Sequence, residues 1–159
     1  MKLGSGESYR RIKPVDISGV VPLLDGLPWF HVNQEGKTPD SYGCDVVLKQ
    51  QFPAQVFELL DSLALGGELA RAILRRLEPR QSIPLHVDSW MPTGMDWRRF
   101  QVPLVSDSFV VMQWPDVGKA VWLEPGFLWE VRYDTPHEVV NCSDIPRIHM
   151  QIDVVDATI

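Results

Sequence analysis

The sequence predicts a mainly β protein whose strands form a sandwich or a barrel. Short apolar runs recur at 99–105, 109–114, 120–123, 127–133, 138–141 and 147–155, with turn-forming residues between them. Short strands at such close spacing are typical of antiparallel sandwiches and barrels rather than of alternating βαβ units. The length of 159 residues, with 45% hydrophobic and 23% charged residues, fits one globular domain.

The first half of the chain predicts fewer regular elements. Residues 1–9 are rich in glycine and polar side chains, so we expect a flexible N-terminus before a single domain at 10–159. Turn signals around Trp29 and Phe30 indicate short extended pieces, and 44–48 is a plausible strand. After Pro53, an apolar stripe with helical spacing predicts an amphipathic helix that ends at the glycine pair 66–67; the stripe is Val56, Leu59, Leu60 and Leu63.

The segment 68–77 is ambiguous. Its alanine, leucine and arginine residues favour a helix by intrinsic propensity, whereas the residues also alternate as in a strand. We favour a strand, because the turn-like tetrad 78–81 leads to 82–86, which would pair back as the second arm of a hairpin. We interpret Arg75, Arg76 and Arg80 as a solvated face.

Composition excludes several classes of function. The formal net charge of −6 argues against a protein that binds nucleic-acid backbones. No apolar run approaches the roughly 20 residues of a membrane span, and the start lacks the hydrophobic segment of a signal peptide. We therefore expect a cytoplasmic protein without nucleic-acid or membrane partners. Cys44 and Cys142 lie far apart and form neither a CxxC metal motif nor a disulfide framework.

Three separated pieces carry the chemistry. His86 and Asp88 stand two positions apart, so on a strand they point to the same face. His137 follows after enough residues for a later strand to return beside the first, and Arg147 comes ten positions after His137. Two imidazoles and one carboxylate suit non-haem Fe(II). An arginine on the next strand could donate two parallel hydrogen bonds from its planar guanidinium to the carboxylate of an acidic cosubstrate.

Each piece alone also has an ordinary explanation. A His-x-Asp pair is common by chance, a lone histidine is usually structural, and Arg147 could be a surface strand residue. The order of the pieces, their spacing and the flanking β pattern together favour the metal site.

With the flanking pieces 77–79, 83–88, 99–104, 124–126 and 136–147, the chain resembles the Fe(II)/2-oxoglutarate-dependent oxygenases. Within them it resembles the aspartyl/asparaginyl β-hydroxylase-like branch, which includes L-proline cis-4-hydroxylase. The resemblance covers roughly 68–155. It implies a double-stranded β-helix, a cupin-like jelly roll, with one or two flanking helices.

The resemblance also implies roles for single residues. Catalytic Fe(II) would be held by His86, Asp88 and His137, and Arg147 would pair with the distal carboxylate of 2-oxoglutarate. Arg99 looks like a second cosubstrate contact. Where the family often has Arg-x-His, this chain has Gln101, which can hydrogen-bond but carries no charge.

The implied reaction uses O2 to hydroxylate an unactivated C–H bond and releases succinate and CO2. Because peptide-modifying members tend to lack an acid at the position of Asp88, we expect a small-molecule substrate, most simply a free amino acid. Peptidyl aspartyl or asparaginyl hydroxylation is the alternative. A cupin-type metal protein that does not use 2-oxoglutarate and a noncatalytic jelly roll remain as further alternatives. Candidate substrate contacts are Trp90, Trp29 and Phe30, which lie in predicted loops, and His149, which should share a face with Arg147.

Overall fold

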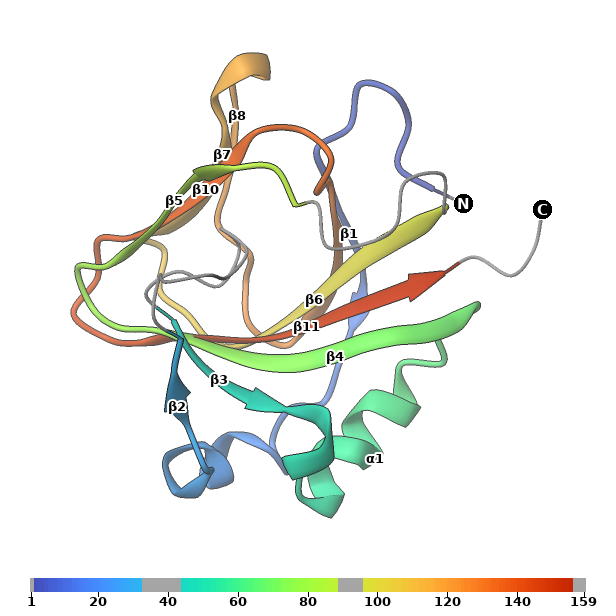
Figure 1. Ribbon diagram of the computed structural model, residues 1–159, viewed down its shortest axis with the longest axis vertical. Coiled ribbons are helices and arrows are strands. Elements are labelled where there is room, and N and C mark those ends of the chain that lie inside the picture. Colours follow the sequence, from blue (N-terminus) through green and yellow to red (C-terminus); the bar gives the residue numbers. More distant parts are fainter. Residues whose placement is uncertain (1, 33–43, 89–95, 156–159) are drawn as a thin grey trace.

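The computed structural model describes residues 2–32, 44–88 and 96–155, and its strands form two antiparallel sheets that face each other (Figure 1). The larger sheet has the order β1 (Tyr9–Pro14), β9 (Phe127–Val131), β6 (Trp97–Val105), β11 (Arg147–Val155), β4 (Glu68–Leu77), β3 (Asp45–Leu48) and β2 (Phe30–His31). The smaller sheet has the order β5 (Ser82–His86), β10 (His137–Asn141), β7 (Val110–Trp114) and β8 (Lys119–Val121). The predicted mainly β jelly roll is confirmed.

One α-helix is present in the described residues, α1 (Ala54–Ser62), beside the short 3-10 helices η1 (Val21–Gly26), η3 (Lys49–Gln51) and η4 (Pro115–Val117). α1 begins after Pro53, as predicted, but ends at Ser62 rather than at the glycine pair 66–67. Ala64 adopts a left-handed φ of 50°, which a continuing α-helix does not allow. No helix in the described ranges is long and apolar enough to span a bilayer.

Strand β11 shows how the larger sheet separates two environments. Its apolar side chains, Ile148, Met150, Ile152 and Val154, belong to the core cluster that includes the buried face of α1. The residues between them, Arg147, His149, Gln151 and Asp153, are polar yet also buried. Because alternate residues of a strand face opposite sides of a sheet, these polar side chains point toward the smaller sheet. The space between the sheets is therefore lined partly by buried polar groups, an arrangement that is costly unless each finds a partner.

A second core cluster lies between the two sheets, next to these buried polar groups. Its members include Leu77, Ile83, Met112, Trp114 and Val139, all of them buried. Burying a large apolar side chain is worth about 1.5–3 kcal/mol, so this cluster holds the smaller sheet firmly against the larger one.

The predicted hairpin between 68–77 and 82–86 is wrong, although both segments are strands. β4 is flanked on its two edges by β11 and β3, so no edge remains for β5, which pairs with β10 in the other sheet. The turn at 78–81 is a corner between the sheets, where Arg80 has a left-handed φ of 64°. The side-chain amide of Asn141 fixes this corner by donating to the carbonyls of Leu77 and Glu78, each at 3.2 Å.

The segment ahead of β1, which the sequence predicts to be flexible, is hydrogen-bonded to the end of β9 in the structure. The Arg132 guanidinium donates to the carbonyl of Glu7 at 2.8 Å and to that of Gly4 at 2.6 Å, and its backbone N–H donates to the carbonyl of Ser8 at 2.8 Å. Strand β1 begins at Tyr9, one residue before the predicted domain start.

Candidate metal centre and adjoining cavity

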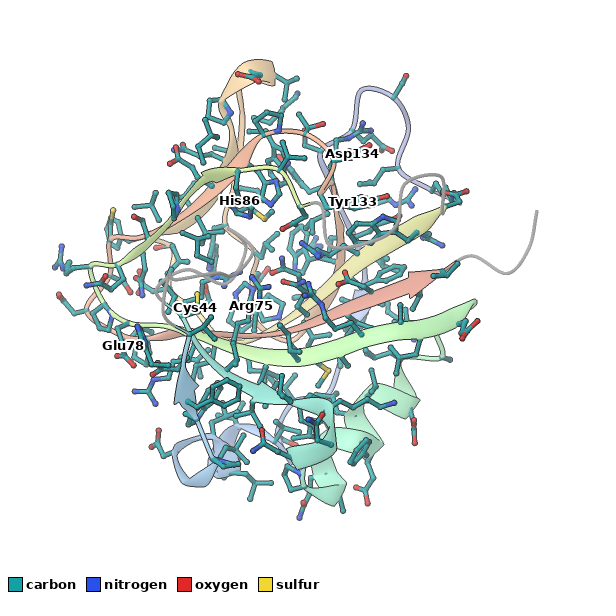
Figure 2. All side chains as sticks on the ribbon, in the orientation of Figure 1. Cys44, Arg75, Glu78, His86, Tyr133 and Asp134 are labelled. Atoms are coloured by element: carbon teal, nitrogen blue, oxygen red, sulfur yellow. The ribbon has the colours of Figure 1, made fainter. Side chains whose placement is uncertain are left out.

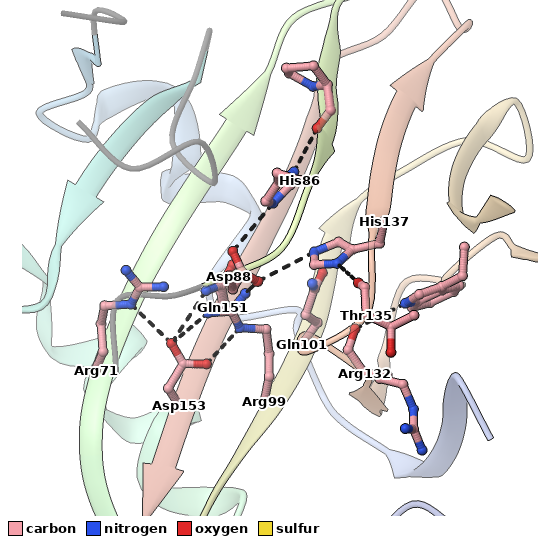
Figure 3. Close-up of polar contacts among 12 residues, drawn as sticks. Arg71, His86, Asp88, Arg99, Gln101, Arg132, Thr135, His137, Gln151 and Asp153 are labelled. Atoms are coloured by element: carbon pink, nitrogen blue, oxygen red, sulfur yellow. Dashed lines mark hydrogen bonds and ion pairs between the residues drawn. The ribbon is translucent and has the colours of Figure 1, made fainter. Parts of the chain in front are cut away.

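Antiparallel pairing of β5 with β10 places His86 directly opposite His137, with ring centroids 4.5 Å apart. Asp88 lies two residues beyond His86, just past the end of β5, where its N–H donates to the carbonyl of Tyr133 at 3.2 Å. One ligand atom from each of His86, Asp88 and His137 lies within 4.8 Å of the others. Figure 3 shows the two imidazoles converging on the carboxylate.

Backbone hydrogen bonds decide which imidazole nitrogens face the carboxylate. His86 Nδ1 lies 2.6 Å from the carbonyl of Pro84, and His137 Nδ1 lies 2.8 Å from that of Thr135. A carbonyl only accepts, so each Nδ1 carries the proton and each Nε2 presents a lone pair. The His86 Nε2 atom is 3.3 Å from Asp88 Oδ1, and the His137 Nε2 atom is 3.4 Å from Asp88 Oδ2.

The electrostatics of this cluster suit a cation. Burial lowers the pKa of His137 to about 4, so the ring is neutral near pH 7 and able to bind a metal. Asp88 Oδ1 is buried and has no hydrogen-bond partner among the described residues. Lone pairs from two nitrogens and a carboxylate thus face one point with no proton between them. This donor set fits a divalent transition metal, with coordination positions left for other ligands.

Arg99 holds the carboxylate from the other side. Its Nη1 donates to Asp88 Oδ2, while its Nε and Nη2 donate to the two oxygens of Asp153 at 2.7 and 3.1 Å. Asp153 also accepts from Arg71 Nε at 3.0 Å. Figure 3 shows this chain of ion pairs running from the partly buried Arg71 to the metal site. The guanidinium of Arg99 is thus occupied by two carboxylates, and its predicted contact with a cosubstrate stays a prediction.

We expect Arg99→Gln to weaken metal binding by about 10- to 100-fold, the usual effect of removing a group that orients a metal ligand. It should also lower the free energy of unfolding by about 3–5 kcal/mol, because the buried Asp88 would lose its arginine partner and Asp153 would keep only Arg71. Metal titration and chemical denaturation measure these two effects. The matched control is Arg98→Gln, which removes the neighbouring arginine that pairs with Glu130. Equal effects of the two substitutions on metal affinity would contradict a role for Arg99 in orienting Asp88.

A small cavity of about 20 Å³ adjoins the metal site between the sheets. Its walls are contributed by both sheets: Arg75, Ile83, His86, Arg99, Gln101, Met112, His137, Val139, Arg147 and Gln151. The apolar members limit the access of water. Three arginines among so few residues make the cavity attractive to an anion.

Arg147 enters this cavity from the first position of β11. It is 3% exposed, and its Nη2 donates to Gln101 Oε1 at 3.0 Å. Burial lowers its pKa to about 10, so the group still carries its charge at neutral pH. No carboxylate of the described residues pairs with it. Burying a guanidinium that has no carboxylate partner among the described residues carries a desolvation cost, which marks this position as a site for an incoming carboxylate.

The interpretation of Arg75 as a solvated residue is wrong. Arg75 is 4% exposed and lies on the inner face of β4, opposite His149 in the register. Figure 2 shows it rising from β4 into the space between the sheets. Arg76 lies on the outer face, where it pairs with Glu78, and Arg80 is exposed and pairs with Asp144. The signal was present in the sequence: two adjacent arginines on a strand point to opposite faces, so one of them points inward.

Of the predicted substrate residues, the three that the structure describes do not line the cavity beside the metal cluster. Trp29 packs with the core cluster on the outer face of the larger sheet, where its Nε1 donates to the carbonyl of Leu24 at 2.7 Å. Phe30 is 38% exposed on the edge strand β2. His149 is buried behind the cavity wall, and its Nδ1 lies 2.7 Å from Gln101 Oε1. Trp90 falls outside the described residues.

His149 gives a prediction about pH. Burial, and next the charge of Arg147, lower its pKa well below 6.5, so the folded protein keeps this ring neutral. The unfolded chain binds the proton near pH 6.5, so stability falls as the pH drops below that value, by up to about 1.4 kcal/mol per pH unit. We expect His149→Gln to flatten this dependence between pH 6.5 and 5.5, as measured by urea unfolding of metal-free protein. The exposed His31→Gln is the control, and an unchanged slope for His149→Gln would contradict the assignment.

No protein-family model and no curated protein matched the sequence. Solved structures do match. The viral collagen prolyl hydroxylase vCPH of Paramecium bursaria Chlorella virus-1, solved as a 2OG complex, superposes with a TM-score of 0.66 at 12% identity, covering 96% of this chain and 98% of that one. The α-ketoglutarate-dependent carbocyclase SnoK from nogalamycin biosynthesis gives 0.65 at 15% identity, covering 96% and 81%.

A third match is an oxidoreductase of the 2OG-Fe(II) oxygenase family from Burkholderia pseudomallei, with a TM-score of 0.65 at 12% identity, covering 92% of this chain and 84% of that one. At such low identity the likeness concerns the fold. The chain therefore has the jelly-roll fold of the Fe(II)/2-oxoglutarate oxygenases, and the His86, Asp88 and His137 cluster lies between its two sheets.

Proposed function

We propose that this protein is a dioxygenase that uses Fe(II), 2-oxoglutarate and O2 to hydroxylate an unactivated C–H bond, releasing succinate and CO2. One observation carries the proposal. Two unprotonated Nε2 atoms and a carboxylate face one point beside a cavity that also holds Arg147, a buried cation with no carboxylate partner in the described residues. The shared fold of the three oxygenase structures supports it.

His86, Asp88 and His137 would hold Fe(II), and the bound metal and cosubstrate would supply the oxidising chemistry. The protein's own groups prepare the site. The hydrogen bonds to Pro84 and Thr135 orient the imidazoles, burial keeps His137 neutral, and Arg99 fixes the carboxylate.

The cosubstrate end of the site is built from Arg147 and Gln101. Arg147 would bind the distal carboxylate of 2-oxoglutarate, and Gln101 holds its guanidinium in place. Gln101 carries no charge, so it orients the Arg147 guanidinium without neutralising the charge that the cosubstrate carboxylate would pair with. Ile83, Met112 and Val139 line the same cavity and would exclude water from the cosubstrate.

Succinate formation tests the reaction class. Purified protein supplied with Fe(II), 2-oxoglutarate and air should release succinate slowly without a prime substrate and faster with one. The control is His86→Ala, which should release none above background while remaining folded. Succinate production by His86→Ala at the wild-type rate would overturn the proposal.

For the prime substrate we propose a free amino acid. A hollow of about 280 Å³ adjoins the metal site through Arg99 and Tyr133, whose carbonyl binds the backbone of Asp88. Its lining includes the stacked rings of Trp97 and Tyr133 and charged residues of both signs, namely Lys2, Asp96, Arg98, Glu130, Arg132 and Asp134. Charges of both signs beside an aromatic wall suit a zwitterion.

Screening free amino acids for stimulated succinate release tests this choice of substrate. Stimulation by one of them supports the proposal. If a peptide containing aspartate or asparagine stimulates release and no free amino acid does, the peptidyl hydroxylase alternative is correct instead.

The cupin-type alternative, in which the metal acts without 2-oxoglutarate, would leave the buried charge of Arg147 unexplained. It predicts metal binding that 2-oxoglutarate does not influence. The oxygenase proposal predicts tighter 2-oxoglutarate binding in the presence of the metal, because both groups share one cavity.

A further inference from the structure

Arg75 is the one of the three buried arginines in the cavity to which the proposed function assigns no role. We propose that Arg75 and Arg147 together bind the distal carboxylate of the cosubstrate, and that this pair makes the site selective for a dicarboxylic 2-oxo acid. The inference rests on the proposed function, which assigns only Arg147 to that carboxylate.

The register of β4 and β11 brings the two arginines together. Arg147 lies opposite Leu77, and His149 lies opposite Arg75. Arg75 and Arg147 are therefore diagonal neighbours on the same face, about 7–8 Å apart at the backbone, which long side chains easily bridge. Both side chains line the cavity that also contains His86 and His137. A carboxylate in this cavity would thus be within reach of two guanidinium groups from adjacent strands.

The charges in the cavity support the same assignment. Arg99 is balanced by Asp88 and Asp153, with which it forms ion pairs. Arg147 has no such carboxylate among the described residues. Burial lowers the pKa of Arg147, Cys44 opposes this shift, and the charge of Arg75 adds a smaller lowering. An anion that binds beside both guanidinium groups would be attracted by both charges.

Chemistry adds a reason why an arginine is suited to the position of Arg75. A guanidinium is planar and can donate two parallel hydrogen bonds to a carboxylate, whereas a lysine ammonium acts as a point charge. Two guanidinium groups around one carboxylate would contribute nothing to a 2-oxo acid that ends in a methyl group. The pair therefore discriminates by the distal group and not by chain length.

The test compares Arg75→Gln with Arg76→Gln, which removes the adjacent arginine on the opposite face of the same strand. Dissociation constants for 2-oxoglutarate and for 2-oxopentanoate, which has the same chain length but no distal carboxylate, are measured by calorimetry on anaerobic Fe(II)-loaded protein. We expect Arg75→Gln to weaken 2-oxoglutarate binding about tenfold or more and to change 2-oxopentanoate binding less than about threefold. Arg76→Gln should leave both constants near wild type.

Two results would overturn the inference: unchanged 2-oxoglutarate binding in Arg75→Gln, or an equal loss of affinity for both acids, which would indicate a packing role. If Arg75→Gln does not fold, as judged by its thermal transition, Arg75→Lys takes its place. The lysine keeps the charge but loses the planar guanidinium, so the preference for 2-oxoglutarate over 2-oxopentanoate should fall by less than in a variant without the charge. A wild-type protein that loads Fe(II) but does not bind 2-oxoglutarate would overturn the proposed function as well, and this outcome is distinct from a failure of Arg75 alone.

Discussion

Replacing Asp88 by alanine is expected to weaken Fe(II) binding by more than about 100-fold and to abolish succinate formation. The substitution removes one of three ligands, and loss of groups that merely orient a ligand already costs about 10- to 100-fold. It also leaves Arg99 with Asp153 as its remaining carboxylate. Metal content after anaerobic gel filtration and a succinate assay measure both effects.

Two further variants give the Asp88 prediction its controls. Asp116→Ala removes an exposed carboxylate of η4 that lines neither cavity, and it should retain both metal and activity. Asp88→Asn keeps the shape of the side chain and loses its charge, so it should also lose the metal. Full iron content and wild-type turnover in Asp88→Ala would show that the cluster is not the catalytic centre.

Replacing Arg147 by glutamine is expected to raise the KM for 2-oxoglutarate by about 100-fold or more while iron binding remains. The substitution removes a buried charge-assisted pair, each bond of which is worth about 1.5–3 kcal/mol. Because Arg147 does not contact the metal cluster, the two readouts should separate. Steady-state kinetics with varied 2-oxoglutarate and a parallel iron titration provide them.

The control for Arg147 is Arg80→Gln, which removes an exposed arginine that pairs with Asp144. It should change neither the KM nor the iron content. If Arg147→Gln keeps the wild-type KM for 2-oxoglutarate, the cavity binds the cosubstrate elsewhere or not at all.

The sequence predicted most strands of this fold, because alternation and turn residues are local signals. The segment 68–77 shows the limit of such signals. The segment forms a strand despite its helical propensity, because it is hydrogen-bonded between β3 and β11. These partner strands could not be identified from the local sequence pattern. The hairpin error had the same origin, since a turn-like tetrad can close a hairpin or carry the chain from one sheet to another.

The candidate site shows the same division. His86 and Asp88 were grouped by their spacing, but the direct pairing of His86 with His137 depends on the register of β5 and β10, which no local pattern specifies. The structure places Arg99 on Asp88 and Asp153, a contact across strands that the sequence could not indicate. Arg75 was missed because hydrophilic residues are expected outside, whereas the inner face of this larger sheet is polar and buried.

Anaerobic titration of the protein with Fe(II) and then 2-oxoglutarate tests the central claim most directly, because it examines the metal site and the cosubstrate cavity together. We predict a visible metal-to-ligand charge-transfer band that appears only with both components, is absent in Asp88→Ala, and requires far more 2-oxoglutarate in Arg147→Gln. Binding of iron without this band would favour a cupin-type metal protein, and failure to bind iron would contradict the assignment of His86, Asp88 and His137 as its ligands.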